Sequence, residues 1–276
     1  MDGVTHHGRR TVYRRFDRSG GDDGDGEDTG DRDGNGGSEP GAMLCIHGSG
    51  GSSGVWKAQS RLADRRPVVA LDLSGHGESE DVDADPGYGC LSAYADDVVA
   101  VARETDARVL VGNSLGGAVA MTVALERGGD LDLDGLVLAG TGARLAVLDD
   151  LLHWLEGDFE RAVEFLHAPD RLFHDPDERY LSESREAMLE AGQAVTSRDF
   201  HTCHVFDVRD RLGDVDVPAL AVVGEHDQLT PPYYHEFLAE EMPDCDLAVV
   251  EDAAHLAMVE QPEAFNAALE EFFERL

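Results

Sequence analysis

Three side chains of the kinds that carry out acyl transfer stand at separate points of the chain: Ser114, Asp227 and His255. A serine hydroxyl is a weak nucleophile on its own, and it needs a neutral imidazole to accept its proton. A buried carboxylate in turn fixes the tautomer of that imidazole and stabilises its cation. Each of the three residues closely follows an apolar run that predicts a buried strand. Because parallel strands end at the same edge of a sheet, we expect the three side chains to meet there.

The predicted nucleophile, Ser114, lies in the middle of a G-x-S-x-G pattern. Residues 107–120, ARVLVGNSLGGAVA, predict a strand, a sharp turn and a helix. A serine on such a turn has crowded backbone dihedrals, and glycines two residues before and after it remove side chains that would clash. The turn also aims the first N–H groups of the helix at the hydroxyl, where they can stabilise a developing negative charge. In a chain with 31 glycines the pattern alone would be weak evidence, but its strand-to-helix context supports the prediction.

The elements that must position these side chains alternate along the chain. Strands are predicted at residues 11–16, 42–46, 67–73, 109–111, 136–140, 217–224 and 246–250, and helices at 56–62, 91–104, 115–127, 233–242 and 262–276. This alternation predicts an α/β fold with a mostly parallel central sheet and helices on both faces.

From about residue 144 to residue 213 the strand pattern stops, and consecutive amphipathic helices are predicted instead. We expect this segment to form an inserted helical cap over the carboxyl end of the sheet, where Ser114 would project. For any single aromatic residue of the cap ordinary packing is the favoured interpretation, yet some must line the substrate pocket; the candidates are Trp154, Phe159, Phe165, Phe173, Phe200 and Phe206.

The predicted domain organisation has four parts. Residues 1–18 and 40–143 form the first part of the core, residues 144–213 the cap, and residues 214–276 the second part of the core. Between the first two core segments, residues 19–39 contain eight glycines and eight acidic residues and no aliphatic residue. Such a composition buries too little apolar surface to offset the entropy of ordering, so it predicts a disordered loop.

The charge balance is extreme, with 57 acidic and 22 basic residues and a net charge of −35. A chain this acidic repels nucleic acid and anionic membranes, so neither is an expected partner. The acidic residues occur in every segment and Lys57 is the single lysine, a composition similar to that of proteins from salt-accumulating halophiles. We therefore expect a halophilic protein in a cytoplasm of high salt, where ions screen the self-repulsion of the chain.

The remaining composition narrows the class further. No apolar run approaches the length of a membrane span, and no apolar segment near the N-terminus marks a secretory signal, so we expect a cytoplasmic protein. None of the four cysteines pairs at C-x-x-C spacing, which argues against a zinc site and a redox pair. We expect no metal and no organic cofactor, and the sequence leaves the oligomeric state open.

Several motifs together resemble the α/β-hydrolase superfamily, in its capped form with a serine nucleophile. They are His47-Gly48, DLSGHG at 72–77, GNSLGG at 112–117, GEHD at 224–227 with Thr230-Pro231, and His255, in the family's order Ser, Asp, His. The resemblance covers residues from about 41 to the C-terminus.

That resemblance implies a role for each site residue. Ser114 would be the nucleophile, His255 the general base and then acid, and Asp227 the residue that orients His255. The oxyanion hole would consist of the backbone N–H of Leu115 together with that of Ser49 or Gly50.

Other candidates fit the family pattern less well. Glu225 and Asp252 lie close to Asp227 in the sequence and could take its place. By the family pattern, His47 shapes the oxyanion turn. His76 stands between two glycines in a loop, which favours a structural role.

The function that the resemblance implies is hydrolysis of a carboxylic ester, with a small apolar ester as substrate and an acyl-enzyme as intermediate. Hydrolysis of carbon–carbon bonds in ring-cleavage dienones is an alternative, since that branch has similar GNS and HGSG motifs; against it, Leu256 follows His255 where that branch commonly has tryptophan. Cofactor-free haloperoxidases and lactonases are further alternatives. The non-enzymatic alternative is a ligand receptor or scaffold. Serine instead of aspartate at the turn argues against haloalkane dehalogenases and epoxide hydrolases.

Overall fold

The computed structural model describes residues 1–16 and 40–276, so the disordered loop predicted at residues 19–39 lies outside the described residues. Its framework is an eight-stranded sheet with the strand order β1-β2-β4-β3-β5-β6-β7-β8. The strands are β1 (Asp2–His6), β2 (Arg9–Phe16), β3 (Ala42–Ile46), β4 (Val68–Leu71), β5 (Ala107–Asn113), β6 (Gly135–Ala139), β7 (Ala219–Gly224) and β8 (Cys245–Val250).

Most of the sheet is parallel. Pairing is antiparallel from β1 to β2 and from β2 to β4, and parallel between all other neighbours. The central strands β3 to β7 are short apolar runs buried along nearly their whole length, as expected when both faces of a parallel sheet are covered. The predicted α/β fold with a mostly parallel sheet is confirmed.

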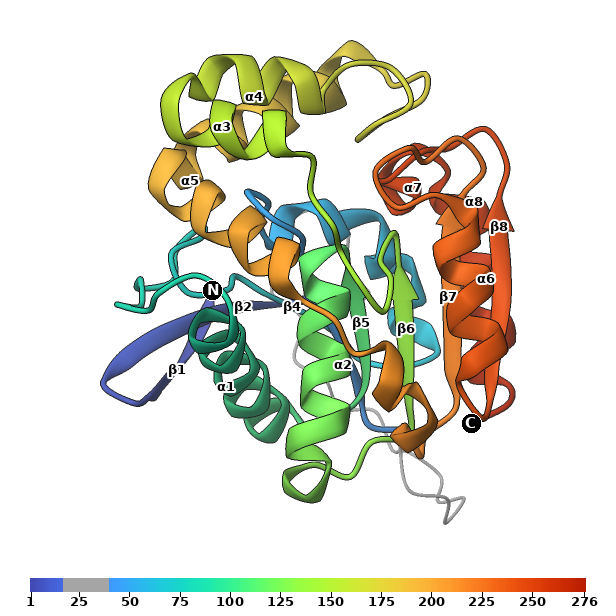
Figure 1. The fold of residues 1–276 in the computed structure, drawn as a ribbon. Coiled ribbons are helices and arrows are strands. Elements are labelled where there is room, and N and C mark those ends of the chain that lie inside the picture. The colour runs from blue at the N-terminus through green and yellow to red at the C-terminus, as the bar shows by residue number, and fades with distance from the viewer. Residues whose placement is uncertain (17–39) are drawn as a thin grey trace, which may run out of the picture.

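Helices cover both faces of this sheet (Figure 1). Leu44 and Ile46 of β3 belong to one apolar core, which includes residues of α1, α2 and α6. Met43 and Cys45, which point to the opposite face, belong to a second core with residues of η1 and α8. The helices in chain order are η1 (Ser53–Asp64), α1 (Tyr88–Thr105), α2 (Leu115–Arg127), η2 (Gly128–Asp130), α3 (Asp149–Gly157), α4 (Phe159–Leu166), α5 (Glu178–Val205), η3 (Arg209–Asp214), α6 (Pro232–Glu241), α7 (Ala257–Glu260) and α8 (Pro262–Phe273).

Three helices, α3, α4 and α5, stand between β6 and β7 in the chain and lie beyond the carboxyl-terminal edge of the sheet (Figure 1). The range of α5 contains two helical stretches that meet at a kink at Gly192, whose φ of 80° is outside the helical region. Glycine is the residue that adopts such a positive φ most readily. An isolated bridge between Arg144 and Asp207 joins the two chain segments that lead into and out of this layer.

Two local features differ from the sequence-based expectation. The strand β1 is absent from the prediction because its residues, DGVTH, are largely exposed and form no apolar run. The predicted helix at 56–62 is the longer 3-10 helix η1, whose first turn is capped by the Ser52 side chain.

None of the helices in the described part of the chain is long and apolar enough to cross a membrane. All four cysteines are free thiols.

Candidate active site

The turn that carries Ser114 joins β5 to α2 and is strained. Ser114 has φ 54° and ψ −116°, a backbone region that residues with a side chain rarely adopt. A Cβ atom on Gly112 would lie 2.3 Å from the carbonyl oxygen of Gly116, and one on Gly116 would lie 2.2 Å from the carbonyl oxygen of Ile46. Both glycines of the G-x-S-x-G pattern are therefore required by close backbone approach, which is why this turn can exist here.

A buried pair, Asp227 and His255, lies at the ends of β7 and β8. His255 Nδ1 is 2.8 Å from Asp227 Oδ2, and both side chains are almost fully buried. The carboxylate also accepts hydrogen bonds from the N–H groups of Leu229 and Thr230 and from the Thr230 hydroxyl. Burial alone would raise the pKa of Asp227, but the charge and hydrogen bond of His255 and the bonds from Thr230 outweigh it and lower this pKa. Asp227 is therefore an ionised acceptor that holds the Nδ1 side of His255.

The backbone of His255 is fixed from two sides. Its N–H donates to the carbonyl of Arg171 at 3.1 Å, and its carbonyl accepts from Asn113 Nδ2 at 3.2 Å. Asn113 also donates to the carbonyl of Ala139, so the residue before Ser114 links the serine turn to the histidine loop. Sequence reasoning gave Asn113 no role, because the residue before the serine in a G-x-S-x-G pattern can be of any type and carries no signal by itself.

The contact at Arg171 is part of a seam between the α4–α5 connection and the two loops of the buried pair. Three backbone N–H groups donate across it: Gln228 to Asp170 at 2.9 Å, His255 to Arg171 at 3.1 Å, and Leu256 to Leu172 at 2.9 Å. The segment outside the sheet and the loops that carry Asp227 and His255 are therefore hydrogen-bonded together.

The expected oxyanion donors are the N–H groups of Leu115 and of Ser49 or Gly50, and they differ in whether they already have an acceptor. A Cβ on Gly48 would lie 3.1 Å from Ser114 Cβ, so the glycine-rich turn after β3 packs directly against the serine. The N–H of Gly50 donates to Asp199 Oδ2 at 3.3 Å. The N–H groups of Ser49 and of Leu115 have no acceptor among the residues of the two described segments. Of the two alternatives for the first donor, only Ser49 has its N–H available.

His47 and His76 are both buried and each is committed to a structural contact. His47 Nε2 accepts from the N–H of Leu73 at 3.0 Å, and burial lowers the pKa of His47 to about 4, so the ring is neutral. His76 Nε2 lies 2.9 Å from Asp199 Oδ2. Burial by itself would lower the pKa of His76, but Asp199 outweighs burial and raises it. Neither histidine lines the pocket described next.

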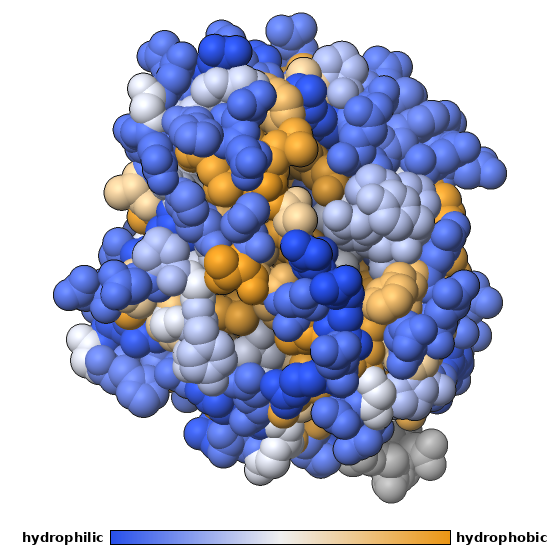
Figure 2. All heavy atoms as spheres, in the orientation of Figure 1, coloured by the Kyte–Doolittle hydropathy of each residue, from blue (hydrophilic) through white to orange (hydrophobic). Residues whose placement is uncertain are grey.

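A cavity of about 260 Å³ opens beside Ser114 and His255. Its other walls come from the glycine-rich turn, from residues 145–148 and from α5, and they are mainly apolar. In Figure 2 apolar side chains gather in the hollow between the α3–α4 layer and the part of the core around α6 and α7. Of the six aromatic candidates only Phe165 and Phe200 line this cavity; Trp154, Phe159, Phe173 and Phe206 pack into the two apolar cores.

The two acidic alternatives to Asp227 lie elsewhere. Glu225 and Asp252 are exposed and form a group with His226, whose Nε2 is 3.7 Å from Glu225 Oε2. The carboxylate that accepts the hydrogen bond from His255 Nδ1 is that of Asp227 instead.

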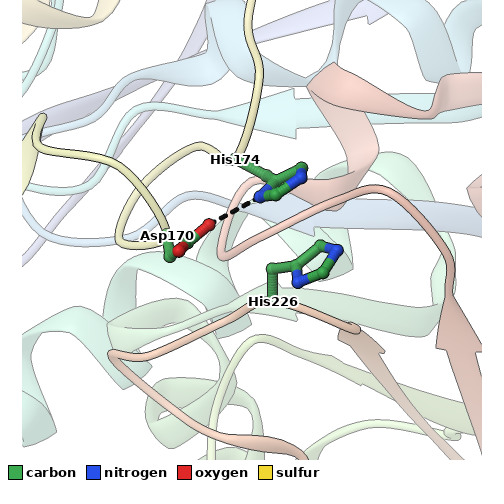
Figure 3. Close-up of side chains that lie close together, drawn as sticks. All are labelled: Asp170, His174 and His226. Carbon is green, nitrogen blue, oxygen red and sulfur yellow. Dashed lines mark hydrogen bonds and ion pairs between the residues drawn. The ribbon is translucent and has the colours of Figure 1, made fainter.

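His226 also belongs to a cluster with Asp170 and His174 that has ligand atoms of the kinds that bind metals (Figure 3). His174 Nδ1 lies 2.5 Å from Asp170 Oδ1, and the two imidazole rings stack 3.7 Å apart at 15°. A metal ion bound to an imidazole lies in the plane of its ring, and these nearly parallel planes do not meet close to the rings. In this arrangement the two histidines do not converge on a single ion, so we assign no metal to the cluster.

Comparison with known proteins agrees with this architecture. The model of the alpha/beta hydrolase family matches residues 43–268. RutD of Azorhizobium caulinodans, named for carbamate hydrolysis, is 31% identical over 82% of this chain and 89% of its own length. The pimeloyl-[acyl-carrier protein] methyl ester esterase of Photorhabdus laumondii subsp. laumondii is 29% identical over 84% of this chain and 92% of its own.

Solved structures extend the similarity to three dimensions. The structure of a thermophilic esterase, 29% identical, superposes with a TM-score of 0.80 and covers 99% of this chain and 97% of that esterase. Fold, family match and similarity to named hydrolases agree, and the resemblance noted from the motifs is confirmed. The chain belongs to the alpha/beta hydrolase family and is a hydrolase.

Proposed function

We propose that this hydrolase cleaves a carboxylic ester through an acyl-enzyme formed on Ser114. The observation that carries the proposal is the shared cavity: Ser114, on its strained turn, and His255, bonded to the ionised Asp227, line the same walls. Serine needs a nearby base, and the base needs a group that holds its tautomer. Ser114, His255 and Asp227 would supply the nucleophile, the base and the orienting group at one cavity.

In the proposed reaction Ser114 Oγ attacks the ester carbonyl carbon while His255 Nε2 takes the hydroxyl proton. Asp227 stabilises the imidazolium and stays ionised, because its hydrogen bonds favour the charged carboxylate. The tetrahedral intermediate then expels the alcohol, which takes the proton back from His255. Water attacks the acyl-enzyme by the same route, its proton passes to His255, and the carboxylic acid leaves as Ser114 regains its proton.

We assign the oxyanion hole to the backbone N–H groups of Ser49 and Leu115. Both amides lack an acceptor within residues 1–16 and 40–276, whereas the N–H of Gly50 already donates to Asp199. Donors of this kind contribute about 2.7–4 kcal/mol each to transition-state stabilisation in acyl transfer. Two orphaned donors beside the serine fit a carbonyl that becomes an oxyanion.

We also propose that residues 144–213 act as a cap between two parts of the core, the first formed by residues 1–18 and 40–143 and the second by residues 214–276. Leu148 and Leu151 at the start of this segment, Phe165 on α4, and Met188 and Phe200 on α5 contribute apolar walls above the serine. An apolar enclosure favours an apolar acyl or alcohol group and excludes water from the charges formed in the reaction. The names of the relatives, a methyl ester esterase and a thermophilic esterase, favour ester substrates over other acyl groups.

The first test is hydrolysis of p-nitrophenyl acyl esters, from short to long chains, in multimolar KCl. We expect turnover by the wild type and a loss of about 10⁴-fold or more in kcat for Ser114→Ala. Ser184→Ala, which removes another hydroxyl from the cavity wall, should retain most of the activity. The acyl chain length that the enzyme prefers then indicates the size of the cavity beside Ser114.

Labelling with a fluorophosphonate separates an enzyme from a receptor on the same fold. The wild type should be labelled and Ser114→Ala should not. Folded protein that resists labelling and leaves every ester intact would contradict the proposal. Folded protein that is labelled but leaves esters intact would direct the assay to lactone and dienone substrates.

A further inference from the structure

A second cavity, of about 450 Å³, adjoins the one that holds Ser114. Four residues line both cavities: Val55 after the glycine-rich turn, Ser184 and Ala187 on α5, and Leu256 after the predicted base. Two of these are among the smallest side chains, so the wall between the cavities is thin. A small movement of these four side chains would join the two cavities.

The second cavity differs from the first in its charge. Its lining includes three cations, Lys57, Arg61 and Arg179, and one carboxylate, Glu183. Arg179 pairs with Glu183 at 2.7 Å, and Arg61 pairs with Glu263. Lys57, the single lysine of the chain, forms no ion pair with any carboxylate of residues 1–16 and 40–276. Lys57 is exposed, so within the described residues its ammonium is an unpaired charge on the wall of the second cavity.

We propose that the second cavity binds an anionic end of the substrate, a carboxylate or a phosphate, and that Lys57 recognises it. The inference rests on the proposed function and specifies its substrate class: an ester whose apolar middle part lies against Val55 and Leu256 and whose far end is negatively charged. The carbonyl carbon sits at Ser114 in this arrangement, and the anion lies against the ammonium of Lys57.

The chemistry of the lining supports an anion more than a neutral group. A carboxylate that leaves bulk water needs hydrogen-bond donors and an opposite charge to compensate its lost hydration. Lys57 supplies the charge on a flexible stem, and the hydroxyls of Ser52 and Ser60 line the same space as donors. The net charge of −35 repels anions from the protein surface as a whole, so an anion bound here needs a cation in direct contact, and Lys57 can supply it.

The test compares matched substrates: p-nitrophenyl esters of linear acids that end in a carboxylate or in the neutral carboxamide. Chains of four to eight carbons are assayed in 2 M KCl. At this ionic strength the Debye length is about 2 Å, so only direct contact with Lys57 contributes. We expect kcat/KM to favour the carboxylate by about threefold to tenfold at the chain length that reaches the second cavity.

Variants of Lys57 distinguish the effect of its positive charge from the effect of its side-chain shape. Lys57→Ala should abolish the preference for the carboxylate and leave the carboxamide rates unchanged, whereas Lys57→Arg should retain the preference. Arg65→Ala is the matched control, because Arg65 follows the same 3-10 helix and is paired with Glu270 but does not line the cavity. This control should behave as the wild type.

A second variant tests the second cavity itself. Ala58→Phe places a large side chain at a position that lines only the second cavity, and it should slow the long anionic substrates at least tenfold while p-nitrophenyl acetate is cleaved normally. Competition by a long-chain alkyl phosphate and by the corresponding fatty acid then identifies the anion, since the tighter inhibitor should lose affinity in Lys57→Ala.

Failure of this inference and failure of the proposed function give different results. If carboxamide and carboxylate chains are cleaved equally well at every length, or if Lys57→Ala keeps the preference, the anion site is wrong while ester hydrolysis stands. If no ester is cleaved and Ser114 resists labelling, the proposed function itself is wrong.

Discussion

Asn113 shows how much of the geometry at the reaction site depends on a residue that does no chemistry. Its amide joins the serine turn to the carbonyl of His255, while Thr230 and Asp227 hold the imidazole from the other side. The proposed nucleophile and the proposed base belong to different loops, so their relative position is set by such cross-links. Errors of about 1 Å in this position can cost 10²-fold in rate.

The first prediction concerns this cross-link. Asn113→Ala leaves the carbonyl of His255 without its donor, so we expect kcat to fall at least tenfold with a small change in KM. The free energy of unfolding should fall by about 1–3 kcal/mol, the usual cost of an unsatisfied buried polar group. Thr122→Val is the control, because its buried hydroxyl bonds within α2 to Ala118. An Asn113→Ala enzyme with wild-type kcat would show that the cross-link is dispensable.

The second prediction concerns Gly116. Gly116→Ala would place a Cβ 2.2 Å from the carbonyl oxygen of Ile46, so the turn and β3 must separate. We expect the free energy of unfolding to fall by about 3 kcal/mol and activity to drop with it. Gly157→Ala on α3, where the added Cβ meets nothing within 4 Å, should leave the thermal midpoint unchanged or raise it. Equal midpoints for the two variants would be inconsistent with this packing.

Among the contacts that attach α5 to the core, one buried carboxylate, that of Asp199, has three partners. Asp199 bonds to His76 Nε2 at 2.9 Å, to the Tyr94 hydroxyl at 2.7 Å and to the N–H of Gly50 at 3.3 Å. Three groups from different segments of the chain are therefore hydrogen-bonded to one side chain of α5. One of these segments is the glycine-rich turn proposed to supply an oxyanion donor. A hydrogen bond therefore links α5 directly to this turn.

The third prediction tests this attachment. Asp199→Ala leaves its three buried polar partners, His76, the Tyr94 hydroxyl and the N–H of Gly50, without their acceptor, so we expect a loss of about 3–5 kcal/mol in unfolding free energy. Asp199→Asn keeps part of the hydrogen bonding and should lose less. The exposed Asp150→Asn on α3 removes one negative charge without such contacts and serves as control. Chemical denaturation of the three variants in 2 M KCl measures the difference.

Elements built on apolar runs could be predicted from the sequence, and elements defined by contacts could not. The runs at Ala42–Ile46 and Ala219–Gly224 predict the buried strands that the structure contains. The exposed β1 has no such run, because it is held by pairing with β2. At the site, side-chain types pointed to Ser114, Asp227 and His255. The seam at Arg171 and Leu172 uses backbone groups that every residue has, so no sequence signal marks it.

At the scale of the whole molecule, a buried neutral histidine makes the free energy of unfolding depend on pH. His235 is fully buried, and its Nε2 accepts a hydrogen bond from the N–H of Thr141, whose hydroxyl bonds to the carbonyl of Ser114. Burial lowers the pKa of His235 to about 4. The unfolded chain takes up a proton on this residue near its ordinary pKa of about 6.5, whereas the folded protein resists protonation until lower pH.

The fourth prediction follows from that difference. As the pH falls from about 6.5 to 4, His235 should cost the folded state about 3 kcal/mol, and the stability it supports is fully present only above this range. His235→Gln should therefore flatten the dependence of unfolding free energy on pH between these values. His153→Gln, an exposed residue of α3, should keep the wild-type slope. Parallel slopes for His235→Gln and wild type would refute the assignment.

The fifth prediction concerns the net charge of −35. Ions screen repulsion between surface carboxylates, so the midpoint of thermal unfolding should rise by several degrees as KCl increases from 0.1 to 2 M. Sucrose, which stabilises proteins without screening charge, should give a smaller gain at a concentration of equal osmolality. A midpoint that is independent of KCl would contradict the proposed adaptation to high salt.

The seam between residues 170–172 and the loops of Asp227 and His255 also constrains how the enzyme can work in time. If the helix layer separates from the core along this line, the N–H of His255 loses its acceptor in the same event, while Asn113 still holds its carbonyl. Opening on that side would therefore loosen the loop of the proposed base. Substrate admission and the working geometry of that base would then alternate in time.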